Sequence, residues 1–155
     1  MEKICLVEAG KFTLGIDAAV ILSTRDAESF RDGELEEKFP LLHLGAFLGQ
    51  QSLAVLKPEA VVLEVENCAG LSALLVDRVI GEIAAPDRFE PLPLLYPELT
   101  ARCCPQLFIH QSQLVLQLDV QALRPIREKL QTTCGVVSLV DLSAQSNAGK
   151  KLLNP

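Results

Sequence analysis

Tryptophan is absent from this sequence, and aromatic residues make up only 5% of it. A core that lacks large rings has to be filled with aliphatic side chains. Hydrophobic residues account for 49% of the chain, which is enough for a sizeable interior. The length of 155 residues suits one compact domain or two tightly fused subdomains.

Positive charge is also scarce. The chain has 14 Lys and Arg against 20 Asp and Glu, and its formal net charge is -6. A nucleic-acid surface needs clustered basic side chains to neutralise phosphates, and here the basic residues are scattered. We therefore expect no nucleic-acid partner, and the same shortage disfavours an anionic membrane surface.

Long apolar runs are missing. No segment reaches the roughly 18 uninterrupted apolar residues that a membrane helix needs. The first eight residues lack the apolar stretch of a signal peptide. We expect no direct membrane insertion and a cytoplasmic location.

The cysteines do not form a recognisable site. Their number is odd, no C-x-x-C pair occurs, and the one close pair is adjacent, which is poor spacing for a shared metal or a relaxed disulfide. We interpret them as free thiols that behave as small buried hydrophobes in a reducing compartment. They are Cys5, Cys68, Cys103, Cys104 and Cys134.

Motifs for catalysis are absent as well. The chain has no glycine-rich phosphate loop, no H-E-x-x-H and no G-x-S-x-G. Of the two histidines, His43 lies between leucines and His110 lies in a predicted hairpin turn. Glu64 and Glu66 share one face of a predicted strand, which we interpret as a solvated face. The sequence predicts no catalytic residue, no cofactor and no metal, and so favours a binding module over an enzyme.

What is present is a series of short apolar segments separated by Gly, Pro, Asp and Asn, which is typical of an all-β barrel or sandwich. Asp119 is a suitable N-cap for a short helix at 120–123, and the segment 44–48 could form a helical turn. The predicted strands are 4–8, 12–16, 60–65, 71–80, 107–109, 114–118 and 136–142, and a second short helix is predicted at 125–130.

Two further segments are predicted to be irregular. Residues 23–38 are polar and charged and indicate an exposed loop or an irregular short helix. Residues 85–97 contain four prolines, and because each proline fixes φ and removes a donor, this segment should be an extended crossing.

The stretch from Val61 to Glu82 resembles the signature region of CheW-like domains, which carry an apolar strand, a short hairpin and a strand ending in Val-Asp-x-Val. The order of the other elements is also similar. A Pro-rich segment follows at 89–93, then a hairpin and a leucine-rich strand that ends at Asp119, while Phe12 to Asp17 is similar to the opening Ile-Asp strand. The resemblance covers about Ile4 to Leu123.

The resemblance implies a mainly β fold of two interleaved five-stranded SH3-like barrels with one or two short helices. We assign the CheW-like domain, with its two barrel subdomains, to residues 1–142. The segment 143–155 is enriched in Ser, Asn, Gly and Lys and is predicted to be a flexible C-terminal tail. The resemblance also implies a non-catalytic adaptor in bacterial chemotaxis or motility-type signalling, which couples a CheA-like histidine kinase, through its regulatory domain, to the cytoplasmic helices of a chemoreceptor.

Partner-binding residues are expected at three places in such a fold: Val20 and Ile21, then His43 and Gly45, then Arg78 and Val79. The family's Asn-Leu-Arg-Gly stretch is replaced by the acidic segment 31–38. His43 stands where the family has Asp, and Gly45 stands where Arg often follows. These changes make the receptor a less expected partner than the kinase.

Two alternatives remain open at this point. One is a small-molecule binder or enzyme that uses a cleft between the barrels, lined by Asp77, His43 and other polar groups. The other is a structural or dimerisation module that has lost standard receptor coupling.

Overall fold

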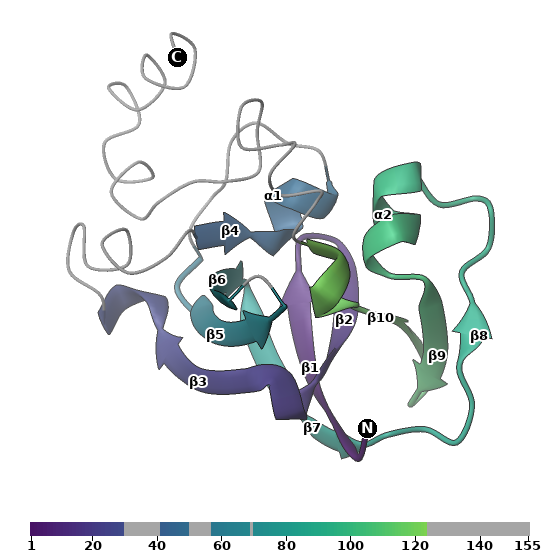
Figure 1. The fold of residues 1–155 in the computed structure, drawn as a ribbon, viewed down its shortest axis with the longest axis horizontal. Coiled ribbons are helices and arrows are strands. Elements are labelled where there is room, and N and C mark those ends of the chain that lie inside the picture. The colour runs from purple at the N-terminus through teal and green to yellow at the C-terminus, as the bar shows by residue number, and fades with distance from the viewer. Residues whose placement is uncertain (30–40, 50–56, 69, 124–155) are drawn as a thin grey trace, which may run out of the picture.

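The computed structural model describes residues 1–29, 41–49, 57–68 and 70–123, and these form a mainly β fold with a few short helices (Figure 1). The strands are β1 (Lys3–Ala9), β2 (Phe12–Asp17), β3 (Ile21–Asp26), β4 (Leu41–His43), β5 (Val61–Asn67), β6 (Gly70–Val76), β7 (Arg78–Ala84), β8 (Glu90–Pro91), β9 (Gln106–His110) and β10 (Gln113–Gln117). The helices are α1 (Leu44–Leu48), α2 (Glu98–Cys103) and the 3-10 turns η1 (Ala18–Val20), η2 (Ala27–Ser29) and η3 (Val120–Ala122). No helix in these ranges is long and apolar enough to cross a membrane.

The strands build two sheets. The first has six strands in the order β7-β1-β2-β10-β9-β8, and the second has four in the order β3-β5-β6-β4. In the first sheet β2 and β10 run parallel, with Leu116 beside Leu14 and Gln117 beside Gly15. Neighbouring strands otherwise pair antiparallel, except that β4 runs parallel to β6. The prediction of a mainly β fold with short helices is confirmed.

One large aliphatic core lies between the sheets. It takes buried side chains from β1, β2, β9 and β10 of the first sheet, from β4, β5 and β6 of the second, and from the helices α1 and α2. The opposite face of the first sheet has a smaller cluster, where Phe89 stacks edge-on against Phe108 with ring centroids 5.6 Å apart. Leucine, valine and isoleucine side chains therefore fill most of this core, as expected for a chain with few aromatic residues.

Most of the predicted local elements are confirmed. The hairpins at 4–16 and 107–118 form, and the short helix at 44–48 is α1. Asp119 caps η3, since its Oδ1 accepts the Gln121 N–H at 3.1 Å. Asp17 caps η1 in the same way and accepts the Ala19 N–H at 3.0 Å.

The prediction of a single strand at 71–80 was wrong. The chain forms two strands there, β6 in the four-stranded sheet and β7 in the six-stranded sheet, with Asp77 between them. Asp77 is buried, and its N–H donates to the Glu8 carbonyl at 2.8 Å. The acid that interrupts the apolar run therefore marks the point where the chain passes from one sheet to the other.

The prediction of a loop or irregular helix from residue 23 was also wrong over its first part. Ile21–Asp26 is an edge strand, and its residues alternate between half-buried and exposed along β5. Polar side chains are common on an edge strand, because one side of the strand faces water. The alternation of apolar and polar residues that predicts a strand is therefore weak in β3. The helix α2 was not predicted, because six residues with one buried Thr and one buried Cys carry little helical periodicity.

Several predictions fall outside the described residues. These are most of the polar segment (30–38), the helix at 125–130, the strand at 136–142 and the tail at 143–155.

The β9–β10 hairpin closes on two residues with positive φ, Gln111 at 48° and Ser112 at 63°. Such a turn prefers Asn-Gly, because other side chains are strained in the left-handed region. We expect the double change Gln111→Asn, Ser112→Gly to raise the free energy of unfolding by about 1 kcal/mol. Urea unfolding measures it, with Gln113→Gly in β10 as the control, which should be destabilising. A lower urea midpoint for the double variant than for the unchanged protein would show that Gln111 and Ser112 are not strained.

Candidate functional site

The carboxylate of Asp77 has polar partners from several elements although the residue is only 6% exposed. Its Oδ2 accepts the Gly10 N–H at 2.8 Å and lies 3.4 Å from the Lys57 ammonium. Gly10 belongs to the β1–β2 turn, so the carboxylate joins a hairpin of one sheet to the strand junction between both sheets. A buried carboxylate is tolerated when hydrogen bonds and an opposite charge compensate for lost hydration, as they do here.

His43 lies on the other side of the same group. It is 5% exposed, its Nε2 is 4.0 Å from Asp77 Oδ1, and its Nδ1 accepts the Ala46 N–H at 3.0 Å. Nδ1 therefore carries no proton and caps the first turn of α1, which leaves Nε2 to face Asp77. The side chain links β4 and α1 to the carboxylate and is enclosed in the protein.

Gly45 is enclosed at the same junction. A Cβ on Gly45 would lie 2.5 Å from the Gly10 nitrogen and 3.1 Å from the Ala9 carbonyl carbon. Only a residue without a side chain lets α1 approach the β1–β2 turn this closely. We call the group Asp77, His43, Gly45, Gly10 and Lys57 the Asp77 junction.

Arg78 is the exposed residue beside this junction. Its guanidinium contacts the Glu8 carboxylate through Nη2 at 2.6 Å and Nε at 3.3 Å, and lies 3.9 Å from Glu59. The hydrogen bond from Arg78 lowers the pKa of Glu8. The pair fastens the start of β7 to β1 on the molecular surface.

The remaining expected residues lie in or next to β3 and β7, which are edge strands of the two sheets. Ile21 opens β3 and packs partly buried against the main core, as does Val20 in η1. Val79 in β7 lines a shallow groove of about 410 Å³ together with Thr24, Arg25, Asp26 and Val61. The structure thus brings His43, Gly45 and Arg78 together around Asp77, places Val79 in this groove, and places Val20 in a different cavity.

Two of the edge strands, β3 and β7, each contain a bulge whose extra residue has an exposed apolar side chain. Leu22 is the extra residue of β3 opposite β5, and Ile80 is the extra residue of β7 opposite β1. They are 52% and 41% exposed. Bulges commonly redirect a side chain at a sheet edge, and each bulge here adds an exposed aliphatic side chain to its strand.

The most exposed apolar residues were not singled out from the sequence. Leu94 and Leu95 are 102% and 93% exposed and occupy the centre of a turn that is closed by the Tyr96 N–H on the Pro93 carbonyl at 3.3 Å. The turn lies in the outer segment between β8 and α2 (Figure 1). Turn centres usually hold Gly, Asn, Asp or Pro, so two leucines between Pro93 and Pro97 were a signal that could have been used.

The Leu94–Leu95 turn is held in place on both sides. Leu92 and Tyr96 pack against the main core, and the Leu92 N–H donates to the Pro105 carbonyl at 2.9 Å. Pro93 adds a fixed φ at the start of the turn. The two leucines are therefore presented outwards by a fixed segment whose neighbours are anchored.

The described residues assemble little reactive chemistry. No group of three or more His, Cys, Asp or Glu side chains among them is arranged to hold a metal ion. Burial raises the pKa of Cys103 to about 12 and raises the pKa of Cys104 as well, so both thiols stay protonated at neutral pH. Cys68 is exposed, against the expectation that the cysteines are buried, while Cys5 is buried as expected.

No model of a known protein family matches the sequence, and no curated protein matches it either. Among solved structures, the chain is similar to the scaffolding protein TtCheW from Thermoanaerobacter tengcongensis. The TM-score is 0.60 at 15% identity, over 77% of this chain and 90% of that one. The fold is CheW-like. At this identity the similarity establishes the fold, and the function has to be argued from the surfaces.

In this structure α1 and the β1–β2 turn are in close backbone contact at the Asp77 junction. Substitutions at two glycines, Gly45 and Gly81, test how much this contact contributes to stability. We expect Gly45→Ala to lower the free energy of unfolding by about 2–3 kcal/mol, since its Cβ would overlap backbone atoms that cannot rotate away. Gly81→Ala in β7 is the matched control, because a Cβ there meets nothing within 4 Å. Urea unfolding of both variants measures the difference, and equal midpoints would contradict the close contact.

Proposed function

We propose that this protein is a non-catalytic adaptor that binds the regulatory domain of a CheA-like histidine kinase in bacterial chemotaxis or motility-type signalling. The observation that carries the proposal is the Leu94–Leu95 turn. The structural neighbour, which is described as a scaffolding protein, supports an adaptor role for this fold.

The turn has the properties of a docking element. Burying a leucine side chain contributes about 1.5–3 kcal/mol, so two of them can supply a large part of a binding free energy. Because Pro93 and the anchored Leu92 and Tyr96 already fix the segment, little conformational entropy is lost on binding. The partner should offer an apolar pocket that receives both leucines.

The charges near the turn favour a protein over a membrane surface. Glu90 in β8 and Glu98 in α2 flank the turn in sequence and are exposed, with Glu98 paired to Arg102. Carboxylates beside inserted leucines would be repelled by anionic lipid head groups. A protein pocket with basic residues at its rim suits this arrangement.

A second docking face is proposed along the edge strands, for chemoreceptor helices. It consists of the groove with Val79, the neighbouring Arg78, and Val20 and Ile21 at the start of β3, extended by the bulge residue Leu22. In this proposal the buried His43 and Gly45 support the docking face indirectly. They belong to the Asp77 junction, which fixes β7 relative to β1. An apolar helix face could lie across such a groove.

The kinase interaction is tested by changing the turn. We expect Leu94→Ser with Leu95→Ser to weaken binding of the kinase regulatory domain at least tenfold, because the apolar anchors are lost. Serine is well accepted in turns, so the free energy of unfolding should stay within about 0.5 kcal/mol of the unchanged protein. Isothermal titration calorimetry with the regulatory domain from the same organism gives the affinity, and urea unfolding gives the stability.

Leu71→Ser is the matched control, since Leu71 is 49% exposed on β6 and lies away from the turn. It should bind the kinase domain as the unchanged protein does. The proposal fails if the unchanged protein does not bind, or if the turn variant and the Leu71 variant bind equally well.

A further inference from the structure

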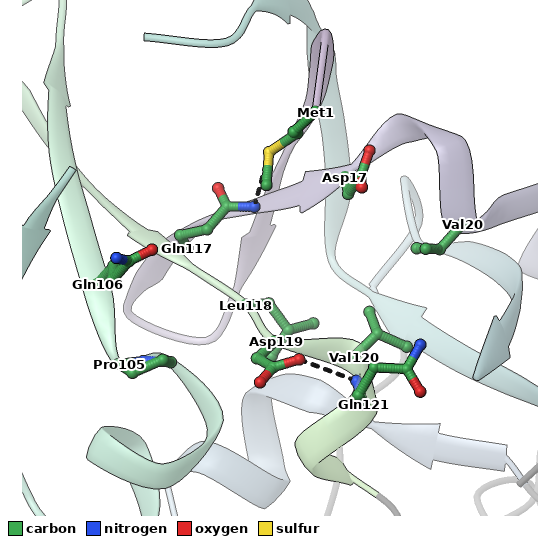
Figure 2. A pocket seen from close by; sticks show the side chains of 10 residues that line it. All are labelled: Met1, Asp17, Val20, Pro105, Gln106, Gln117, Leu118, Asp119, Val120 and Gln121. Atoms are coloured by element: carbon green, nitrogen blue, oxygen red, sulfur yellow. Dashed lines mark hydrogen bonds between the residues drawn. The ribbon is translucent and has the colours of Figure 1, made fainter. Parts of the chain in front are cut away.

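Three of the short helices in the described part of the chain begin at a side chain that accepts a backbone N–H. Asp17 caps η1, Asp119 caps η3 and His43 caps α1. Figure 2 shows the two aspartates, with the Asp119 carboxylate bonded to the Gln121 N–H. The aspartates accept with an oxygen, whereas His43 accepts with a ring nitrogen that can also bind a proton. The cap of α1 therefore differs in kind from the other two.

Histidine and aspartate side chains take up a proton in different pH ranges. The reference pKa is about 6.5 for an imidazole and about 3.9 for an aspartate carboxyl group. In the structure the His43 ring is neutral, since its Nδ1 accepts the Ala46 N–H at 3.0 Å. Nε2 carries the proton of the neutral ring, so a second proton can be added only at Nδ1. Mild acid therefore acts directly on the atom that caps α1.

A proton on Nδ1 removes the cap. The imidazolium ring has two N–H donors and no acceptor, so its Nδ1–H would point at the Ala46 N–H. Ala46 is 3% exposed and lies in the first turn of α1, where an N–H has no carbonyl partner within the helix. A buried N–H without an acceptor is unfavourable. The first turn of α1 then has to move until this N–H reaches water.

Asp77 offers the imidazolium ring a different bond. Its Oδ1 lies 4.0 Å from His43 Nε2, which is too long for a hydrogen bond. The carboxylate attracts a positively charged ring, and a movement of about 1 Å would form a charge-assisted bond of about 2.8 Å. Lys57 lies 3.4 Å from Oδ2 of the same carboxylate, and its half-exposed ammonium can turn away into water.

The other strands around α1 add no further charge at the ring. α1 packs against β1, β4 and β6. Apart from His43 itself, β4 and β6 contain no titratable residue. The titratable residues of β1 and the β1–β2 turn contact other groups: Lys3 with Glu82, Cys5 with the main core, Glu8 with Arg78, and Lys11 with Phe12. Over the described residues, Asp77 and Lys57 are therefore the charged groups that act on His43.

We propose that His43 is a pH-dependent cap, which holds the first turn of α1 at neutral pH and releases it in mild acid by bonding to Asp77 instead. Gly45, beside the cap, is in backbone contact with Gly10, so release of α1 also opens its contact with the β1–β2 turn. The released form binds one more proton than the capped form, so a fall in pH favours it. This inference is independent of the adaptor role.

NMR of the full chain at a series of pH values tests the proposal. We expect the amide signal of Ala46 to move together with the imidazole signals of His43, with one common midpoint. The protection of the Ala46 amide against hydrogen exchange, corrected for the intrinsic effect of pH, should fall about tenfold from about pH 7.5 to about pH 5.5. The protection of the Ala19 and Gln121 amides, which have carboxylate caps, should change by less than about twofold.

Two variants assign the response to its residue. His43→Asn keeps a capping oxygen but has no proton to take up, so the response of Ala46 to pH should disappear. His110→Asn removes the other histidine of the chain and should leave the response unchanged.

The proposal is overturned if His43 titrates without a change at Ala46, if His43 takes up no proton above about pH 5, or if Ala19 and Gln121 respond as Ala46 does. These three comparisons use the unchanged protein, so they decide the matter even if a variant does not fold. A response of Ala46 that persists in His43→Asn would also overturn it.

Discussion

The buried carboxylate of Asp77 is the interaction on which the rest of the structure depends. It receives the Gly10 N–H of the β1–β2 turn, faces His43 at the start of α1, and lies beside the Lys57 ammonium, while its own backbone N–H bonds to β1. Each of these partners belongs to a different part of the chain. Hydrophobic burial drives the two sheets together without direction, whereas these polar contacts fix how they meet. Gly45 completes the arrangement, since its missing side chain allows α1 to lie on the turn.

A rigid junction has a consequence for the surface. β6 and β7 meet at Asp77 and belong to different sheets, so the edge strands β3 and β7 of the two sheets border one groove. The bulges at Leu22 and Ile80 place apolar side chains in solvent. On the other side of the molecule, the Leu94–Leu95 turn stands on residues packed into the shared core. Exposed aliphatic groups on fixed supports suit binding to other proteins.

The sequence predicted the regular part of the fold well, for reasons that are local. Period-two leucines and valines with short turns identified the three hairpins, and Asp119 was identified as a cap from its position alone. Long-range features were less accessible. Asp77 was seen to interrupt an apolar run, but nothing in the neighbouring residues shows that the chain changes sheets there. The polar strand β3 is defined by pairing with β5, which lies about 40 residues further along the chain. Whether Leu94 and Leu95 are core or surface also depends on packing that the sequence does not display.

The most direct test of the account is hydrogen exchange at the Gly10 amide, measured by NMR under native conditions. A turn amide that bonds only to water exchanges quickly, through small local motions. If Asp77 joins the two sheets as described, the Gly10 amide should instead be protected almost as strongly as the central amides of β1, since it opens only when the sheets separate. Rapid exchange of Gly10 alongside slow exchange in β1 would contradict the central role of Asp77.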